Sequence, residues 1–263
     1  MRLWWEVGVR SFRRASTYRL ATASGVFTNT IFGYLRASIL VFVAGAGGAA
    51  IGMTGEELVT FAFVSQGFLM IIGAFGDPEL ADRIRSGDVV IDLYRPADVQ
   101  LWWMANWFGR AAFQLLARGL PPVVLGAMAF DLAWPDPWWH WPVFALSVLV
   151  ASTLGFAIRF CANLSAFWLL DNRGVDQMVT LLMSFFAGLL LPITLFPAWL
   201  ARVASLLPFA SMVQLPVELY LGRHEGAAIV WVLTQQLLWL VALLGLGRAL
   251  LVAATRRVVI QGG

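Results

Sequence analysis

The stretch AAIVWVLTQQLLWLVALLGLGRALLVA (residues 227–253) contains a single charged side chain, Arg248. A membrane-spanning helix needs about 20 largely apolar residues, because a rise of about 1.5 Å per residue must cross roughly 30 Å of hydrocarbon. This stretch is therefore long and apolar enough to span a bilayer. Five more runs meet the same criterion, and the six together predict an all-α membrane domain over residues 22–255. The predicted spans are residues 22–48, 56–76, 102–130, 142–170, 177–196 and 227–253.

The composition supports a membrane protein and excludes several kinds of site. Of the 263 residues, 60% are hydrophobic and 13% are charged, whereas a soluble domain is roughly half apolar and about a quarter charged. All 18 basic residues are arginine, so the chain cannot form a phosphate-binding loop ending in Gly-Lys-Ser/Thr, nor a Schiff-base lysine. Its single cysteine, Cys161, excludes an intrachain disulfide and a cysteine metal cluster.

The arginines predict how the six spans are oriented. Eleven lie in segments on one side of the predicted membrane: the N-terminal segment, the loops after the second and fourth spans, and the tail 256–263. The opposite side carries two, Arg202 and Arg223. Because cytoplasmic loops of membrane proteins are enriched in basic residues, we expect both termini to be cytoplasmic. This bias also explains the basic composition without a nucleic-acid partner.

The first 21 residues have the pattern of an amphipathic helix. At 100° per residue, polar side chains fall on one face and apolar side chains on the other. This pattern predicts a helix that lies in the membrane plane, and a frayed polar lead-in is the alternative. The polar face holds Arg2, Glu6, Arg10, Arg13 and Thr17, and the apolar face holds Trp4, Trp5, Phe12, Ala15 and Tyr18.

The loop between the second and third spans, residues 77–100, is unusually charged. Asp77 and Pro78 are suited to the first positions of a helix, and Gly87 to a left-handed stop, so we expect a short helix over 78–86. Alternating apolar side chains after Gly87 indicate an extended return to Arg95, which precedes a proline. The loop is either a docking helix for a soluble partner or a solvated turn. We expect four charged side chains of the helix to be exposed: Glu79, Asp82, Arg83 and Arg85.

The segment before the last span is interrupted by proline. Pro192, Pro197, Pro208 and Pro216 each start or break a helix. We therefore expect short helices at the outer face over residues 192–222 in place of a further span. Backbone that breaks at membrane depth must be sheltered by protein or must line a cavity.

Besides Arg248, which we assign to the inner interface at the end of the last run, four arginines fall within the apolar runs, where a charged side chain is costly. No acidic residue lies in the interior of the same runs, since Glu56 and Glu57 stand at the outer end of the second. The arginines therefore either serve a hydrated pathway for anionic groups, or extend to an interface or to backbone carbonyls. We regard Arg36 and Arg159 as the pathway candidates, and the full set is Arg36, Arg110, Arg118 and Arg159. Three glycines, Gly67, Gly73 and Gly76, are expected to let helices approach closely.

Enzyme chemistry finds little support in the sequence. Neither His140 nor His224 has a second ligand at metal spacing, and no nucleophile is paired with a base. A lipid-acting membrane enzyme would have to use Glu57, Asp131 or His140. That enzyme and a passive channel subunit remain the alternatives to a transport subunit.

Three features resemble the membrane-spanning permeases of type-2 ATP-binding-cassette (ABC) exporters, in particular those of bacterial antibiotic and sodium export systems. IRSGDVVIDLYRP (84–96) is similar to a family loop motif, and LLLPITLFPAWLARVASLLPFASMVQLPVELYLG (189–222) to a proline-punctuated family segment. The basic ending RRVVIQGG (256–263) is the third feature. The motif positions in the loop are Arg85, Gly87, Asp92, Arg95 and Pro96.

The resemblance implies an exporter subunit in the bacterial inner membrane that pairs with a second permease, identical or related, and with two ABC ATPase subunits. ATP and Mg²⁺ would be bound by the ATPase, while this chain would hold no cofactor or metal and would contact membrane lipids but no nucleic acid. The loop after the second span would be a coupling helix, and the segment before the sixth span would help to close the exit. The implied coupling residues are Glu79, Asp82, Arg83, Arg85, Gly87, Asp88, Asp92, Arg95, Asn172 and Arg173. The pathway or outer-gate residues are Arg36, Arg159, Pro192, Phe196, Pro197 and Pro208.

Overall fold

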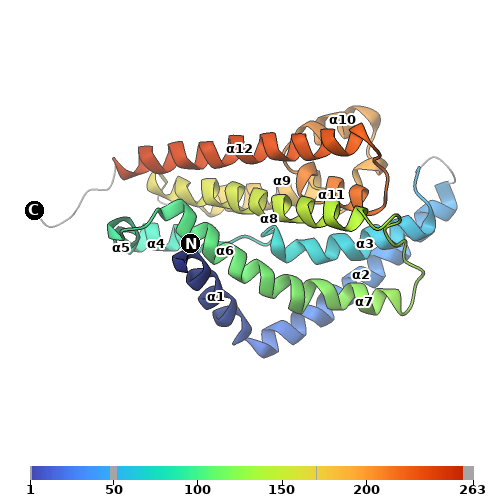
Figure 1. Ribbon diagram of the computed structural model, residues 1–263, viewed down its shortest axis with the longest axis horizontal. Helices are drawn as coiled ribbons and strands as arrows, with labels where there is room; N and C mark the ends of the chain where they lie inside the picture. The colour runs from blue at the N-terminus through green and yellow to red at the C-terminus, as the bar shows by residue number, and fades with distance from the viewer. Residues whose placement is uncertain (1, 48–51, 170, 257–263) are drawn as a thin grey trace, which may run out of the picture.

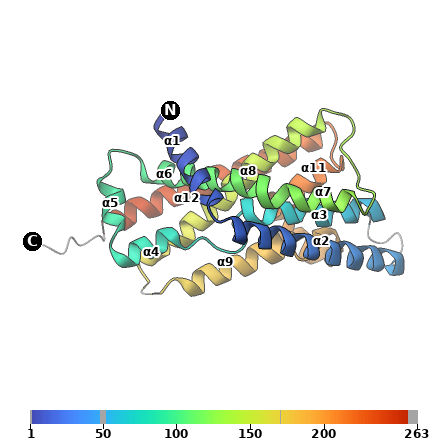
Figure 2. The ribbon, with the colours of Figure 1, turned by 90° about the horizontal axis from the view of Figure 1, so that it is seen from below.

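The computed structural model describes residues 2–47, 52–169 and 171–256, and within these ranges the chain is helical, with no strand. The long helices run along the long axis of the molecule (Figures 1 and 2). The short helices α1, α4 and α5 and the C-terminal end of α12 lie at one end of this bundle, and α10 and α11 lie at the opposite end (Figure 1). The predicted all-α class is confirmed.

Within the described ranges, seven helices form the body of the bundle and five others form its ends and edges. The body comprises α2 (Arg19–Gly47), α3 (Gly55–Ile71), α6 (Val99–Gln114), α7 (Leu120–Ala127), α8 (His140–Leu164), α9 (Arg173–Phe186) and α12 (Ala227–Thr255). The other five are α1 (Arg2–Ser16), α4 (Glu79–Ser86), α5 (Val89–Tyr94), α10 (Ala198–Leu206) and α11 (Gln214–Tyr220). Single turns of other helix types lie between them: the π turn η2 (Leu115–Gly119) and the 3₁₀ turns η3 (Ser165–Phe167), η4 (Ile193–Leu195) and η5 (Ala210–Met212).

The exposed surface of the long helices is apolar. Within the described residues, three helical stretches are long and apolar enough to cross a membrane: Arg19–Val43, His140–Phe167 and Ala227–Thr255. Large apolar side chains project outward from two of them, including Phe42 (76% exposed) and Trp231 (68%). A water-soluble surface rarely exposes apolar patches this extensive, so these helices are suited to contact with lipid.

The core is built around α8. From Val150 to Leu164 nearly every residue of this helix is buried, and it packs against α12, α11, α9 and α6. Leu154 on α8, Phe61 on α3 and Met183 on α9 have no exposed surface and belong to one hydrophobic cluster. A largely apolar helix is expected at the centre of a bundle, and the exposed apolar side chains of α8, such as Leu146 and Leu149, lie in its first half.

Two of the predicted spans are wrong at their C-terminal ends. The span 56–76 corresponds to α3, which stops at Ile71, and the span 177–196 corresponds to α9, which stops at Phe186. Left-handed glycines follow each stop: Gly73 (φ 68°) and Gly76 (φ 88°) after α3, and Gly188 (φ 85°) after α9. Hydropathy counts apolar residues but does not detect this backbone reversal, which glycine adopts without a steric penalty.

The glycine prediction is corrected in part. Gly67 does serve close packing, because a Cβ there would lie 3.3 Å from the backbone oxygen of Gly119. Gly73 and Gly76 instead form the turns that end α3. There too the space is tight, since a Cβ on Gly73 would lie 2.5 Å from the Trp107 ring.

The predicted span 102–130 forms a rod from Val99 to Ala127 that is interrupted by the π turn η2. The turn ends just before Pro121 and Pro122, which lack the N–H groups that would bond the carbonyls of the preceding turn. One of these carbonyls, that of Arg118, accepts a hydrogen bond from Asn29 Nδ2 on α2 at 3.4 Å. Helix irregularities of this kind are frequent at functional sites.

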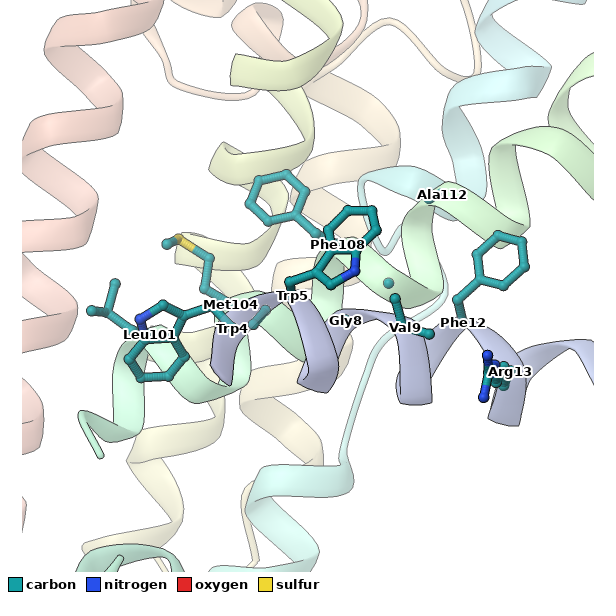
Figure 3. A pocket seen from close by; sticks show the side chains of 12 residues that line it. Trp4, Trp5, Gly8, Val9, Phe12, Arg13, Leu101, Met104, Phe108 and Ala112 are labelled. Atoms are coloured by element: carbon teal, nitrogen blue, oxygen red, sulfur yellow. The ribbon is translucent and has the colours of Figure 1, made fainter. Parts of the chain in front are cut away.

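α1 is a helix, as predicted, and packs mainly against α6. Val7 and Ser11 are buried there, and Ser11 Oγ donates a hydrogen bond to Asn106 O at 2.7 Å. Part of the predicted apolar face therefore meets protein and part remains free, since Trp5 is 73% exposed. Beside this contact, α1 and α6 enclose an apolar groove of about 910 Å³, with Arg13 at one end (Figure 3).

The predicted tail 256–263 lies outside the described residues except for Arg256.

Candidate functional site

The charged loop after α3 contains the predicted short helix, with a different start. α4 begins at Glu79 with Pro78 at its N-cap and no side-chain capping bond, so the predicted cap by Asp77 is wrong. The Asp77 carboxylate is instead paired with Arg110 on α6, and Asp77 O accepts a hydrogen bond from Asn163 Nδ2 at 2.7 Å. The predicted stop is confirmed, because Gly87 is left-handed at φ 85°.

The predicted extended return after Gly87 is wrong. Val89–Tyr94 form the short helix α5, whose first turns are closed by hydrogen bonds from Val90 N to Gly87 O and from Ile91 N to Asp88 O. The alternation of apolar residues over so few positions fits one helical turn as well as a strand. The chain becomes extended only at Arg95 (φ −63°, ψ 140°), where the following proline requires it.

Asp92 holds α4 and α5 together. Its side chain is 3% exposed and accepts hydrogen bonds from Arg83 Nε at 2.7 Å and Arg83 Nη2 at 3.1 Å. Arg95 Nη1 lies 3.2 Å from the same carboxylate, and the Arg95 guanidinium lies 4.3 Å from the centre of the Trp102 ring on α6. A buried carboxylate bonded to two arginines links the loop directly to the start of α6.

The inner side of α4 is fixed to the bundle. Leu80 and Ala81 are buried where α4 packs against α8 and η3. On the other side, Arg14 of α1 donates to both oxygens of Glu79, at 2.9 and 2.7 Å. These hydrogen bonds lower the pKa of Glu79, whereas burial raises the pKa of Asp77. The loop is thus joined to α1, α6 and α8.

The second predicted coupling segment lies beside α4. Arg85 pairs with Asp82 within α4, and its Nη1 lies 3.7 Å from Asp171, just before α9. Asn172 is 3% exposed and is the N-cap residue of α9, while Arg173 is exposed. Two segments far apart in the sequence therefore form one surface at this end of the bundle.

The outward side of the loop, called here the α4–α5 surface, combines charge with exposed apolar side chains. Asp82 is the most exposed of the four charged residues predicted for α4, at 57% of its side chain, although it pairs with Arg85. Ile91 is 57% exposed and Tyr94 72%. The α4–α5 surface consists of Asp82, Ser86, Gly87, Asp88, Ile91 and Tyr94.

At the opposite end, the proline-rich segment forms the predicted short helices. Pro192 and Pro208 are buried, Pro197 is the N-cap residue of α10, and Phe196 stacks on Phe185 of α9 with ring centroids 5.0 Å apart. Gln214 stabilises this irregular backbone. Its backbone N–H donates a hydrogen bond to Ala187 O at 3.1 Å, and its side-chain oxygen accepts one from Ile193 N at 3.0 Å.

The two pathway candidates differ in their surroundings. Arg159 is 1% exposed and donates to Asp176 Oδ1 at 2.8 Å, as well as to Thr180 Oγ1 and to backbone carbonyls after α3. Arg36 donates to Ser65 Oγ at 3.1 Å and Gln66 Oε1 at 3.2 Å on α3. The predicted runs contained no acidic partner for the buried arginines in their interiors. In the structure Arg110 pairs with Asp77 and Arg159 with Asp176, and each aspartate lies one residue outside a run, 56–76 or 177–196.

The residues considered for an enzyme have individual contacts within the fold. Glu57 forms a capping box with Thr54 and pairs with Arg223 at 3.2 Å, while the ring Nδ1 of His140 lies 3.1 Å from Leu219 O. Asp131 is exposed in the loop before α8. The part of the chain that the structure describes contains no group of three His, Cys, Asp or Glu side chains arranged to hold a metal.

The sequence patterns missed several residues of these sites. Arg14, Asp171 and Gln214 act through contacts with distant segments, which no local pattern reports. Ile91 and Tyr94 are apolar residues in a charged loop, and that contrast could have marked them as a contact surface.

A family model described as ABC-2 family transporter protein matches residues 31–262. No curated protein and no solved structure matches the chain.

Proposed function

Because this chain belongs to the ABC-2 transporter family, we propose that it is the permease subunit of an ABC exporter, moving a substrate out of the cytoplasm or the inner leaflet. Proteins of this family are membrane transport subunits and generally work with an ATPase partner. We further propose that transport is outward, that a separate subunit hydrolyses the ATP that drives it, and that this subunit docks on a defined surface of the permease.

We propose a six-span topology with both termini in the cytoplasm. The helices α2, α3, α6–α7, α8, α9 and α12 correspond in order to the six predicted runs. The α4–α5 surface, α1 and the end of α12 share one end of the bundle (Figure 1), and the arginine bias favours that end as cytoplasmic. α9, with 14 residues, rises only about 21 Å, so the short helices after it would complete that crossing.

The α4–α5 surface carries the coupling proposal. The two short helices α4 and α5 contact α1, α6, α8 and the start of α9 on their inner side. On their outer side, Ile91 and Tyr94 are exposed among charged residues. Aromatic anchors surrounded by polar groups are typical of protein interfaces. This arrangement favours docking over a solvated turn, which would need neither the buried Asp92 nor the exposed Tyr94.

In the proposed mechanism, ATP-driven closure of two ATPase subunits pushes on α4 and on residues 171–173. The Arg83–Asp92–Arg95 group transmits the push to α6, and the Arg85–Asp171 pair transmits it to α9. The resulting tilt of the helices opens the outer segment between Pro192 and Pro208. ATP and Mg²⁺ are held by the ATPase, and a second permease, identical or related, completes the pathway.

Co-purification with the proposed ABC ATPase partner tests the docking surface. Ile91→Asp combined with Tyr94→Asp should reduce the retained ATPase by about tenfold or more, since loss of a central aromatic anchor costs about 2 kcal/mol. Trp138→Asp is the matched control, because Trp138 is 78% exposed in the loop before α8 and should have no effect on retention. Full retention and normal transport by the Ile91/Tyr94 variant would show that the ATPase docks elsewhere.

A further inference from the structure

The contact between α1 and α6 has two different flanks. One is the apolar groove lined by residues such as Trp4, Phe108 and Ala112 (Figure 3). The other is a cavity of about 460 Å³ between the end of α1, the start of α2 and the α6–η2 segment, and its wall is basic. Three arginines line this second cavity: Arg14, Arg110 and Arg118.

Two of these arginines are neutralised by carboxylates, and the third is not. Arg14 pairs with Glu79, which also lines the cavity, and Arg110 pairs with Asp77. Across the described parts of the chain, no carboxylate lies within 4.0 Å of an Arg118 nitrogen. Its Nη2 donates to Ala21 O, a backbone carbonyl of α2. A full positive charge beside lipid with no counter-ion is costly.

Two residues that line the same cavity carry unsatisfied polar atoms. Arg118 Nε and Gln114 Oε1 are both buried and have no hydrogen-bond partner among the described residues. A buried donor or acceptor without a partner is destabilising. A ligand with acceptor oxygens would balance the charge of Arg118.

The position of Arg118 depends on features of two helices. Arg118 belongs to the π turn η2, and its side chain lies against Gly25 of α2. A Cβ on Gly25 would come within 2.7 Å of Arg118 Nε and 2.8 Å of its Cζ. Only glycine at this position leaves room for the guanidinium.

Exposed Tyr18 and Leu20 side chains lie at or next to the residues that line the cavity. Tyr18, which lines it, is 67% exposed, and Leu20, next to the lining residue Ala21, is 88% exposed. A ligand here would thus meet positive charge inside and apolar surface outside. Guanidinium groups match the oxygens of phosphate in charge and geometry.

We propose that this basic cavity binds the phosphate of an anionic membrane-lipid headgroup, with Arg118 as its main charge partner and the acyl chains outside along Tyr18 and Leu20. The site is separate from the α4–α5 surface and does not depend on the coupling proposal. The guanidinium of Arg118, which has no carboxylate partner, indicates an anionic ligand, and the exposed Tyr18 and Leu20 indicate that the ligand also has an apolar part.

Native mass spectrometry of the purified full chain tests the proposal, with phosphatidylglycerol and phosphatidylcholine offered at equal concentration. The wild type should retain one phosphatidylglycerol at least about tenfold better than phosphatidylcholine, because the second headgroup has no net negative charge. Arg118→Gln should remove this preference. The matched control is Arg13→Gln, an equal loss of charge on α1 outside the cavity, and it should keep the preference.

A second variant separates the position of Arg118 from its charge. Gly25→Ala leaves the net charge unchanged but displaces the guanidinium, so it should also lose the preference for phosphatidylglycerol. If Arg118→Gln and Arg13→Gln lost the preference for phosphatidylglycerol equally, the site would be overturned. The preference would then come from general attraction of anionic lipid to the basic surface. Binding of inorganic phosphate that displaces the lipid and needs Arg118 would overturn the lipid assignment and identify a soluble phosphate ligand.

Discussion

At the scale of single residues, several buried charges of this protein are paired with residues on other helices. Arg159 is the clearest case, since it is 1% exposed and bonded to Asp176, Thr180 and two carbonyls in the turn after α3. These bonds join α8 to the start of α9 and to the end of α3. Arg159 thus has the contacts of a structural anchor, whatever part it plays in transport.

Replacing Arg159 with Met should destabilise the protein. The apolar substitute leaves Asp176 and the carbonyls of Gly73 and Ala74 without their donor, and breaking a buried ion pair costs about 3–5 kcal/mol. This corresponds to a fall of roughly 10 °C in Tm for a chain of this size. Thermal unfolding in detergent, followed by tryptophan fluorescence, measures the change.

The control for this prediction is Arg202→Met, because Arg202 is exposed on α10. Surface substitutions are usually worth less than about 0.5 kcal/mol, so its Tm should stay close to that of the wild type. Equal Tm values for the Arg159 and Arg202 variants would show that the Arg159 bonds add no net stability.

At the scale of elements, α1 is attached by direct backbone contact. A Cβ on Gly109 of α6 would lie 2.0 Å from Gly8 O and 2.8 Å from Gly8 C. Only glycine at position 109 permits this approach, whereas a Cβ on Gly8 would lie 3.5 Å from Ala105 O, an ordinary contact. The amphipathic helix is therefore positioned by α6 as well as by any membrane surface.

Gly109→Ala should detach α1. The added methyl group cannot be accommodated without moving the α1 backbone, so amide hydrogen exchange should rise across Arg2–Ser16 while α8 stays protected. Gly245→Ala on α12 is the matched control, since nothing lies within 4 Å of its Cβ position, and it should leave exchange in α1 unchanged. Protection of α1 in the Gly109 variant at the wild-type level would contradict the proposed close packing.

At the scale of the whole molecule, charge gathers at the two ends and apolar surface lies between them. One end holds the Arg14–Glu79, Arg83–Asp92 and Arg248–Asp98 pairs, and the other holds the Arg223–Glu57 pair. This distribution matches a protein that crosses a bilayer, where charge is tolerated at the aqueous faces.

Single cysteines in a chain lacking Cys161 test the orientation. Ser86 lies at the α4 end, and Asp131 and Glu225 lie in loops expected at the outer face; all three are exposed. In intact cells, an impermeant maleimide should label Asp131→Cys and Glu225→Cys, and should reach Ser86→Cys only after permeabilisation. Labelling of Ser86→Cys alone in intact cells would reverse the topology.

Much of the helical pattern could be predicted from the sequence because it depends on local properties. Apolar runs, the left-handed stop at Gly87 and the proline breaks after Pro192 each act within a few residues. The errors also have local causes: the runs 56–76 and 177–196 continue past Gly73 and Gly188, and the alternation after Gly87 fits one helical turn as well as a strand.

By itself, the sequence determined a helical membrane protein with a charged loop at one end and a proline-broken segment before its last long helix. Only the tertiary structure decided which charges meet. Arg14 and Glu79 are 65 residues apart in the chain, and Arg118 and Ala21 are 97 apart. Composition and periodicity describe which face of a helix is apolar, but the partner of a buried charge depends on how separate helices pack.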